Sequence, residues 1–257
     1  MKTKSQHIKI IFTLILIGFI PRQADSQVLL SLLFGDKLNS GKFEFGLDGG
    51  INLSNMSNTE GNMAPDWNIG FFFYIDLSEK SFIHTGVLVK SKWGVNNLGP
   101  YPTGDDDVDS LMHGESTMDR NISYFNVPIS YCHYVYDGIF LEGGFMLGLR
   151  TKATDEMRAT STVGDDVIVQ VDISNQLTRL DAGLLGGAGY KFQKGLGIAL
   201  GVRYYYGLVE VHTDNWGNKH NNSNLFFFVT APIGKGKAQR AKEEKERQLR
   251  EQQMQNN

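Results

Sequence analysis

The chain has almost no cysteine, with Cys132 the only one among 257 residues. A single cysteine excludes an intramolecular disulfide, even in a chain that is exported to an oxidising compartment. Cys132 lies within an alternating apolar run, so we interpret it as a small filler residue of a strand and not as a catalytic thiol. The fold must therefore be held by packing and hydrogen bonding alone.

The chain also has little net charge, formally −3 from 25 basic and 28 acidic residues. Nucleic-acid-binding domains usually carry a strong basic excess, so we expect no nucleic-acid partner. The length fits one β domain with long loops.

Long apolar runs are absent except at the N-terminus. Lysines precede the apolar run Ile10–Ile20, and Ala24-Asp25-Ser26 has the small-x-small pattern of a cleavage site, which is typical of a secretory signal peptide. The apolar run is shorter than the ~20 residues of a permanent membrane helix. We predict a signal peptide over residues 1–26, removed before Gln27, which is not a lipid-acceptor cysteine. Any later membrane crossing would have to use strands.

What the sequence does contain is alternation, most clearly in Leu180–Leu208. Two runs flank the polar break Gln193–Gly195, a pattern that predicts a β-hairpin. In both runs apolar residues share one face, and glycines or charged residues share the other. The runs match the ~9 to 11 residues of a tilted membrane-crossing strand, and their apolar faces end in aromatic residues, as the girdles of outer-membrane barrels do.

Six further runs alternate in the same way, and the connections between them are alternately long and short. Bacterial outer-membrane barrels have long extracellular loops, short periplasmic turns and an even number of strands. We therefore predict an all-β fold, an eight-stranded antiparallel up-and-down transmembrane β-barrel over residues 43–234, with both ends periplasmic. A soluble, lipocalin-like periplasmic barrel that binds a small hydrophobic ligand is an alternative. The six runs are Phe43–Leu53, Asn68–Leu77, Ser81–Trp93, Ile122–Val135, Ile139–Arg150 and Asn224–Ile233.

Three details of the barrel are also predicted. Strict alternation in Ser81–Trp93 places Trp93 outward. Pro128 has no N–H for the ladder, so we expect a local bulge there. Val167–Val171, in an otherwise polar connection, is expected to prolong a hairpin beyond the membrane.

The two flanking segments are expected on the periplasmic side. Residues 27–42 form either a brief helix or a pairing-competent segment, and the sequence supports both. Residues 235–257 form a charged tail in which Glu243 with Arg247 and Glu246 with Arg250 are helix-supporting pairs. We interpret it as a solvated, partly helical tail, with a partner-binding helix as the alternative.

The predicted inward face carries five acids and five bases. An eight-stranded barrel has an interior just wide enough for side chains to fill, so we expect these groups to pair as a plug that leaves no water channel, with the inward glycines making room for them. An ion or proton pathway is the alternative. The predicted network consists of Glu44, Asp48, Asp76, Glu142 and Asp181 with Lys90, Lys92, Arg150, Lys191 and Arg203.

Motifs for cofactors and catalysis are scarce. Asp105, Asp107 and Asp109 have the spacing of a hard-cation loop, yet the glycine and bidentate glutamate of an EF-hand are missing, so we interpret residues 105–109 as a solvated acidic loop. We predict no cofactor, no metal and no enzymatic activity. A rim-located enzyme acting on lipid or peptide is the alternative, but no G-x-S-x-G element accompanies the histidines of the predicted outer loops. These histidines are His113, His212 and His220.

Three segments carry a resemblance to a known family: LLSLLFGDKLNSGKFEFGLDGGINLSN, YFNVPISYCHYVYDGIFLEGGFMLGLRTKA and LDAGLLGGAGYKFQKGLGIALGVRYYYGL. Over residues 27–233 the chain resembles the PorT-like outer-membrane β-barrel proteins of Bacteroidetes. The resemblance implies a barrel in the outer membrane, in contact with its lipid. Because the family is named after a member implicated in type IX secretion, it also implies a binding, structural or secretion-supporting role. A periplasmic or secretion-system protein would then be a partner, reached through the tail.

Overall fold

The computed structural model describes residues 42–102, 104, 109, 116–160, 166–193, 196–213 and 219–233. The predicted signal peptide, all but the last residue of the segment 27–42, and the charged tail lie outside these residues. No helix in the described part of the chain is long and apolar enough to cross a membrane.

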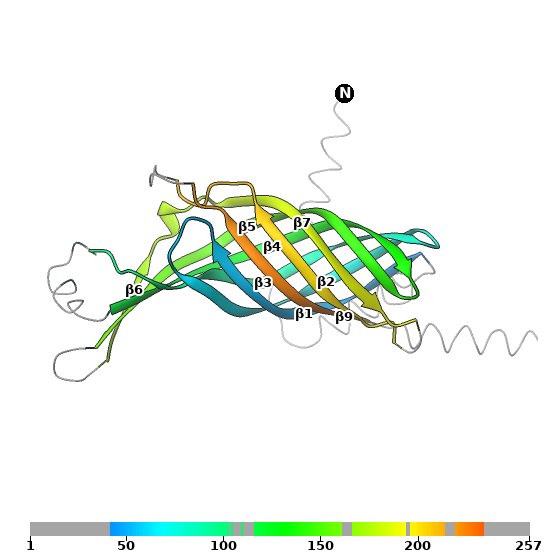
Figure 1. The fold of residues 1–257 in the computed structure, drawn as a ribbon, viewed down its shortest axis with the longest axis horizontal. Helices are drawn as coiled ribbons and strands as arrows, with labels where there is room; N and C mark the ends of the chain where they lie inside the picture. Colours follow the sequence, from blue (N-terminus) through cyan, green and yellow to red (C-terminus); the bar gives the residue numbers. More distant parts are fainter. Residues whose placement is uncertain are drawn as a thin grey trace, which may run out of the picture. The chain divides into compact units, whose positions relative to one another are not determined.

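Eight antiparallel strands form a closed ring, and a ninth strand lies outside it. The hydrogen-bonded order around the ring is β4-β3-β2-β1-β9-β8-β7-β5, and pairing between β4 and β5 closes it (Figure 1). This confirms the predicted eight-stranded up-and-down barrel. The strands are β1 (Phe43–Met56), β2 (Asn62–Ser78), β3 (Ser81–Leu98), β4 (Ser116–Tyr136), β5 (Ile139–Thr160), β6 (Asp166–Asp172), β7 (Leu180–Lys191), β8 (Ala199–Gly207) and β9 (Asn222–Pro232).

The outer surface of the ring is apolar because alternation sends one parity of each strand outward. Leu184 on β7 is 58% exposed, and Ile51 on β1 is 57% exposed. Residues of the opposite parity on the same two strands, such as Asp48 and Leu185, are buried. A soluble barrel would present polar side chains on this outer surface, so the apolar belt excludes the lipocalin-like alternative as a description of the fold.

The predicted faces of β3 fail beyond Leu88 because of a β-bulge. Ile69 on β2 pairs with Lys90 and the next residue, Gly70, pairs with Leu88, so Val89 is an extra residue. One extra residue reverses the side-chain parity of the rest of the strand. Trp93 is consequently buried, with 2% exposure, and not outward as predicted.

The bulge expected at Pro128 is also wrong. The β4–β5 register runs without a shift through the pair Pro128–Met146. On the other side, Thr85 pairs with Ile129 and Leu88 with Asn126 in one continuous register. Thr85 Oγ1 donates to the Pro128 carbonyl oxygen at 2.9 Å, so a side chain bonds this stretch of backbone while the register continues.

Three strands project beyond the ring on one side, at the left of Figure 1. β4 and β5 are 21 and 22 residues long, about twice the ~9 to 11 residues needed to cross a membrane. β5 pairs with β7 over Ile139–Leu149 and with β6 over Thr154–Thr160. The predicted prolongation at Val167–Val171 is therefore confirmed as strand β6.

The two ends of the barrel differ. Short turns at Glu79–Lys80 and Asp137–Gly138 lie at the end where β1 begins and β9 finishes. The other end carries the longer connections and the projecting strands (Figure 1). By the asymmetry of bacterial barrels, the short-turn end is periplasmic and the projecting strands are extracellular.

Inside the ring, two clusters of buried apolar side chains fill the lumen. The cluster nearer the periplasmic end has five aromatic residues at its centre, Phe72, Tyr74, Phe82, Phe140 and Phe228. The cluster nearer the extracellular end is built around Trp93, Tyr124, Tyr205 and Phe226.

Candidate functional site: the barrel interior and its two ends

A buried polar group separates the two apolar clusters. On β3, β5 and β8 one polar side chain stands between a residue of the periplasmic cluster and one of the extracellular cluster. These side chains are His84, Glu142 and Arg203, and Asp48 on β1 joins them. All four are buried.

Arg203 holds this group together. Its Nε donates to Glu142 Oε1 at 2.6 Å, and its Nη2 donates to Glu142 Oε2 at 3.3 Å. Nη1 lies 4.0 Å from Asp48 Oδ2. The guanidinium also stacks over the Phe228 ring, with Cζ 4.2 Å from its centroid. A single side chain thereby connects strands on opposite sides of the lumen.

His84 has a defined tautomer within the group. Arg203 Nη2 lies 2.9 Å from His84 Nδ1, and a guanidinium can only donate. Nδ1 is therefore the acceptor, which places the ring proton on Nε2, 4.0 Å from Asp48 Oδ2. The histidine is neutral in this arrangement. It accepts from Arg203, and its Nε2 forms no hydrogen bond within the described residues.

Ligand atoms of His84, Cys132 and Glu142 lie within 4.8 Å of one another and form the candidate metal group among the described residues. The Arg203 guanidinium, a permanent cation, donates to both His84 and Glu142. The Arg203 guanidinium thus supplies the positive charge that a metal ion would bring, so the arrangement does not fit a metal ion.

A second polar group lies at the extracellular end. Arg120 on β4 and Asp155 on β5 form a bidentate pair, with Nε–Oδ1 at 2.8 Å and Nη2–Oδ2 at 2.7 Å. Tyr101, in the connection after β3, donates to Asp155 at 3.0 Å. Arg120 Nη1 also lies 3.2 Å from His212 Nε2, in the β8–β9 connection. The buried ion pair on β4 and β5 therefore contacts both the connection after β3 and the β8–β9 connection.

The environment of this group shifts two pKa values. Burial, and then the neighbouring Arg120 cation, lower the pKa of His212 to about 4. Burial and the Asp155 carboxylate raise the pKa of the Tyr101 hydroxyl to about 12. At neutral pH both groups are uncharged, so His212 accepts from Arg120 and Tyr101 donates to Asp155.

The histidines considered for catalysis have structural contacts. His212 and His220 lie with ring centroids 5.1 Å apart. His220 Nδ1 is 3.0 Å from the Ser57 carbonyl oxygen, which can only accept, and its backbone N–H donates to Glu210. These bonds fasten the β8–β9 connection to the end of β1. His113 and residues 105–108 lie outside the described residues.

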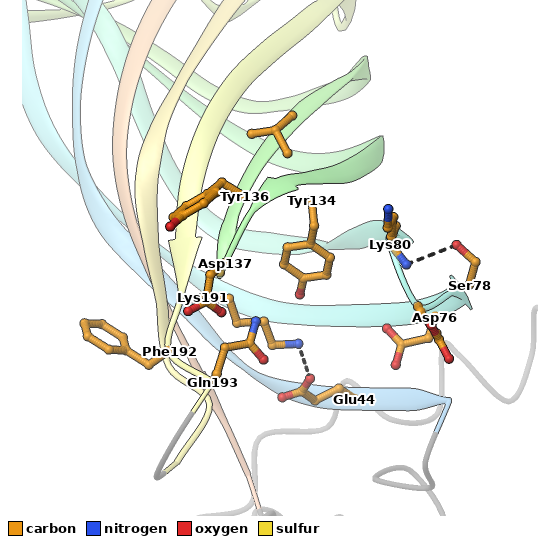
Figure 2. Close-up of a pocket in the computed structure, with 13 residues that line it drawn as sticks. Glu44, Asp76, Ser78, Lys80, Tyr134, Tyr136, Asp137, Lys191, Phe192 and Gln193 are labelled. Carbon is orange, nitrogen blue, oxygen red and sulfur yellow. Dashed lines mark hydrogen bonds and ion pairs between the residues drawn. The ribbon is translucent and has the colours of Figure 1, made fainter.

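The periplasmic mouth holds an open cavity of about 570 Å³. Figure 2 shows Glu44, Asp76 and Lys191 facing it, with Lys191 Nζ paired to the Glu44 carboxylate. The turn residues Glu79 and Asp137 also line it.

The ten residues predicted to form the lumen network lie at different places in the structure. Asp48, Glu142 and Arg203 meet at its centre, and Glu44 meets Lys191 at the periplasmic mouth. Asp181 is buried and accepts from Asn222 Nδ2 at 2.7 Å. Asp76 is exposed and lines the mouth. Arg150 is half-buried and donates to the carbonyl oxygens of Leu177 and Thr178.

The inward orientation predicted for Lys90 and Lys92 is wrong, because the bulge at Val89 turns both outward. Lys90 Nζ lies 3.8 Å above the Trp67 ring. Lys92 pairs with Asp66 at 3.4 Å, and its side chain is 40% exposed. Both lysines therefore belong to the outer rim.

Sequence reasoning did not identify four members of the polar groups: His84, Tyr101, Arg120 and Asp155. His84 alternates onto the same inward face of β3 as Gly86, and this alternation could have identified it as a lumen residue. Arg120 and Asp155 lie in stretches predicted to be loops, and their pairing depends on how far β4 and β5 extend.

A closed antiparallel ring with an apolar outer belt, a filled interior and unequal ends defines an outer-membrane β-barrel. The sequence matches the family model described as outer membrane protein beta-barrel domain over residues 23–213. The chain belongs to this family.

Solved structures of small outer-membrane proteins are similar to the chain at low identity. Ail, the attachment invasion locus protein of Yersinia pestis, is 11% identical, with a TM-score of 0.39 over 75% of this chain and 99% of Ail. Neisserial surface protein A is 12% identical, with a TM-score of 0.38 over 74% of this chain and 97% of that protein. OprG of Pseudomonas aeruginosa is 10% identical, with a TM-score of 0.32 over 74% of this chain and 93% of OprG. The sequence matches no curated protein.

Proposed function

We propose that this protein is a non-enzymatic outer-membrane barrel that works through its extracellular end, by binding or supporting other molecules, and does not pass solutes through its lumen. The observation that carries the proposal is the contrast between the filled interior and the projecting strands. Arg203 and Glu142 meet in the middle of the lumen, whereas β4, β5 and β6 continue outside the ring.

The filled interior argues against transport through the barrel. A solute on the axis would have to pass the aromatic side chains on both sides of the polar group. It would also have to separate Arg203 from Glu142, which would leave two buried charges unpaired.

The extracellular end has the build of a recognition surface. The buried Arg120–Asp155 pair holds β4 and β5 together beyond the ring. Arg158, whose side chain is 54% exposed, pairs with Asp119 and Glu156 on the solvent side. A fixed scaffold with exposed charged groups suits contact with another macromolecule, since rigid elements position binding groups better than loops do.

A rim-located enzyme is less well supported. His212 and His220 serve as partners of Arg120 and of the Ser57 carbonyl oxygen. A catalytic base needs its accepting nitrogen aimed at a nucleophile, and His212 Nε2 faces a guanidinium.

The finer assignment is to the PorT-like barrels of Bacteroidetes, exported by the signal peptide at residues 1–26 and surrounded by outer-membrane lipid. Within it, the tail at residues 235–257 reaches a periplasmic or secretion-system protein. The resemblance of the three quoted segments supports this assignment, and deletion of 235–257 followed by co-purification of periplasmic proteins tests it.

Ion conductance tests the closed lumen. Protein reconstituted into a planar bilayer is expected to give no steady current, whereas Arg203→Ala/Glu142→Ala, which empties the middle of the lumen, is expected to give brief openings. Stable stepwise currents from the unchanged protein would mean that it is a channel.

A trimmed variant tests the extracellular surface. Asp155 pairs with Val171, so replacing residues 156–170 by Asn-Gly joins them by a two-residue hairpin turn and keeps the Arg120–Asp155 pair. Both proteins in nanodiscs are incubated with the secreted and surface fractions of the source cells. The proposal expects a protein retained by the full-length chain and lost from the trimmed one, and identical retention by both would contradict it.

A further inference from the structure

The cavity at the periplasmic mouth has an excess of acids. Four carboxylates and two lysines line it. Lys191 is engaged with Glu44 and lies over the Tyr74 ring at 4.8 Å. Two further lining acids, Glu79 and Asp137, are exposed, and Lys80 is the second lysine of the lining. Like charges gathered around one opening favour a cationic occupant.

The chain leaves the barrel beside this cavity. The last pair between β1 and β9 is Gly46 with Pro232, and the Ile233 N–H then donates to the Phe45 carbonyl oxygen at 2.9 Å. Glu44, which precedes Phe45 in β1, lines the cavity and pairs with Lys191 (Figure 2). Residue 235 therefore comes three positions after the end of β9 and two after Ile233.

The first part of the tail has the complementary charge. Lys235–Lys242 contains four bases and no acid, and the first acid of the tail is Glu243. Eight extended residues reach about 26–29 Å, so the segment is long enough to pass the two short turns that line the cavity.

The segment that precedes β1 in the sequence lacks such complementarity. Residues 27–41 precede β1 and contain one acid, Asp36, and one base, Lys37, in a largely apolar stretch. Charge therefore favours the tail as the occupant of the acidic mouth.

We propose that Lys235–Lys242 docks in the periplasmic cavity, with its basic side chains against Glu79 and Asp137. Docking gives the rest of the tail, Glu243–Asn257, a fixed starting point beside the barrel.

Limited trypsin digestion of the full-length folded protein in detergent tests this docking. Mass spectrometry gives the cleavage rate at each tail site, normalised to a synthetic peptide of residues 234–257. At low salt, cleavage within Lys235–Lys242 is expected to be slowed at least about tenfold more than cleavage after Lys245, Arg247 or Arg250. At 0.5 M NaCl the difference should fall below about threefold, because exposed charge pairs are screened at that ionic strength.

Variants separate docking from shielding by the detergent. Glu79→Gln/Asp137→Asn removes two lining charges and adds no trypsin site, so it should abolish the protection. Glu60→Gln/Asp172→Asn removes two exposed acids at the opposite end and should leave it unchanged. Heat-dependent gel migration checks folding, and if the double variant does not fold, Asp137→Asn alone and the salt series make the same comparison. Equal cleavage of both parts of the tail, or protection that survives the loss of Glu79 and Asp137 charge, would overturn the proposal.

Discussion

Arg203 on β8 and Glu142 on β5 form a bidentate pair across β7, and the residue of β7 that lies between them is Gly187. Glu142 pairs in register with Gly187, and Gly187 pairs with Arg203. A Cβ at Gly187 would lie 2.8 Å from Glu142 Oε1 and 2.5 Å from the Val202 carbonyl oxygen. The missing side chain gives the two long ones room to meet.

Gly187→Ala is therefore expected to lower the free energy of unfolding by about 1–3 kcal/mol, the usual cost of overpacking. Urea unfolding of the barrel in detergent, followed by gel migration, measures it. The control is Gly186→Ala on the outward face of the same strand, where the Cβ meets no atom closer than 3.9 Å. Equal effects of the two substitutions would contradict the role assigned to Gly187.

Removing one partner of the central pair is expected to cost more than removing both. Arg203→Met leaves the Glu142 carboxylate buried, and such a loss typically costs about 3–5 kcal/mol. In Arg203→Met/Glu142→Gln the orphaned charge is gone, so much of that stability should return. A double-mutant cycle in urea gives the coupling energy, expected at about 1–3 kcal/mol. A coupling near zero would mean that the pair adds nothing to the interior.

Trp93 and Trp67 should differ in their contact with lipid. Trp93 is buried, and its Nε1 donates to Ser91 Oγ at 2.8 Å, whereas Trp67 is 47% exposed. In bilayers of brominated lipid, the fluorescence of a variant that keeps only Trp67 should be quenched, and that of one that keeps only Trp93 should not. Strong quenching of Trp93 would show that β3 has no bulge at Val89.

The extracellular end should lose stability in acid through His212. Histidine in the unfolded chain titrates near pH 6.5, whereas the pKa of His212 in the fold is about 4. Between these values the unfolded state binds a proton that the folded state does not, so its contribution is full above pH 6.5 and is lost as the pH falls toward 4. The titratable and charged groups around the ring are Arg120, Asp155, Glu210 and His220.

The difference in unfolding free energy between the unchanged protein and His212→Gln isolates this effect, because glutamine can accept from Arg120 without titrating. The difference should be largest at pH 7.5 and smaller at pH 4.5. A difference that does not change with pH would contradict the lowered pKa.

The barrel itself was predictable because the strands obey a two-residue period over most of their length. The outward parity of Leu47 and Ile51 on β1, or of Leu184 on β7, follows from the sequence alone. The membrane environment strengthens this signal, since the outer face must be apolar whatever fills the interior.

Other features were not predictable, for physical reasons. A bulge adds one residue without changing the composition of the strand. Nothing in the sequence around Val89 therefore indicated that Lys90 lies outward and Trp93 inward. In the run Phe71–Phe73 both faces are apolar, which hides the inward position of Phe72. Arg120 and Asp155 are 35 residues apart in the sequence and meet through the register of β4 with β5, which no local sequence pattern encodes.

The most direct test of the account is migration of the membrane-extracted protein on an SDS gel with and without heating. A closed ring has no free strand edge at which SDS can begin to unfold it. The account predicts a membrane-bound protein whose unheated band runs faster than its heated band. Recovery in the soluble fraction, with one band position regardless of heating, would contradict a closed membrane barrel.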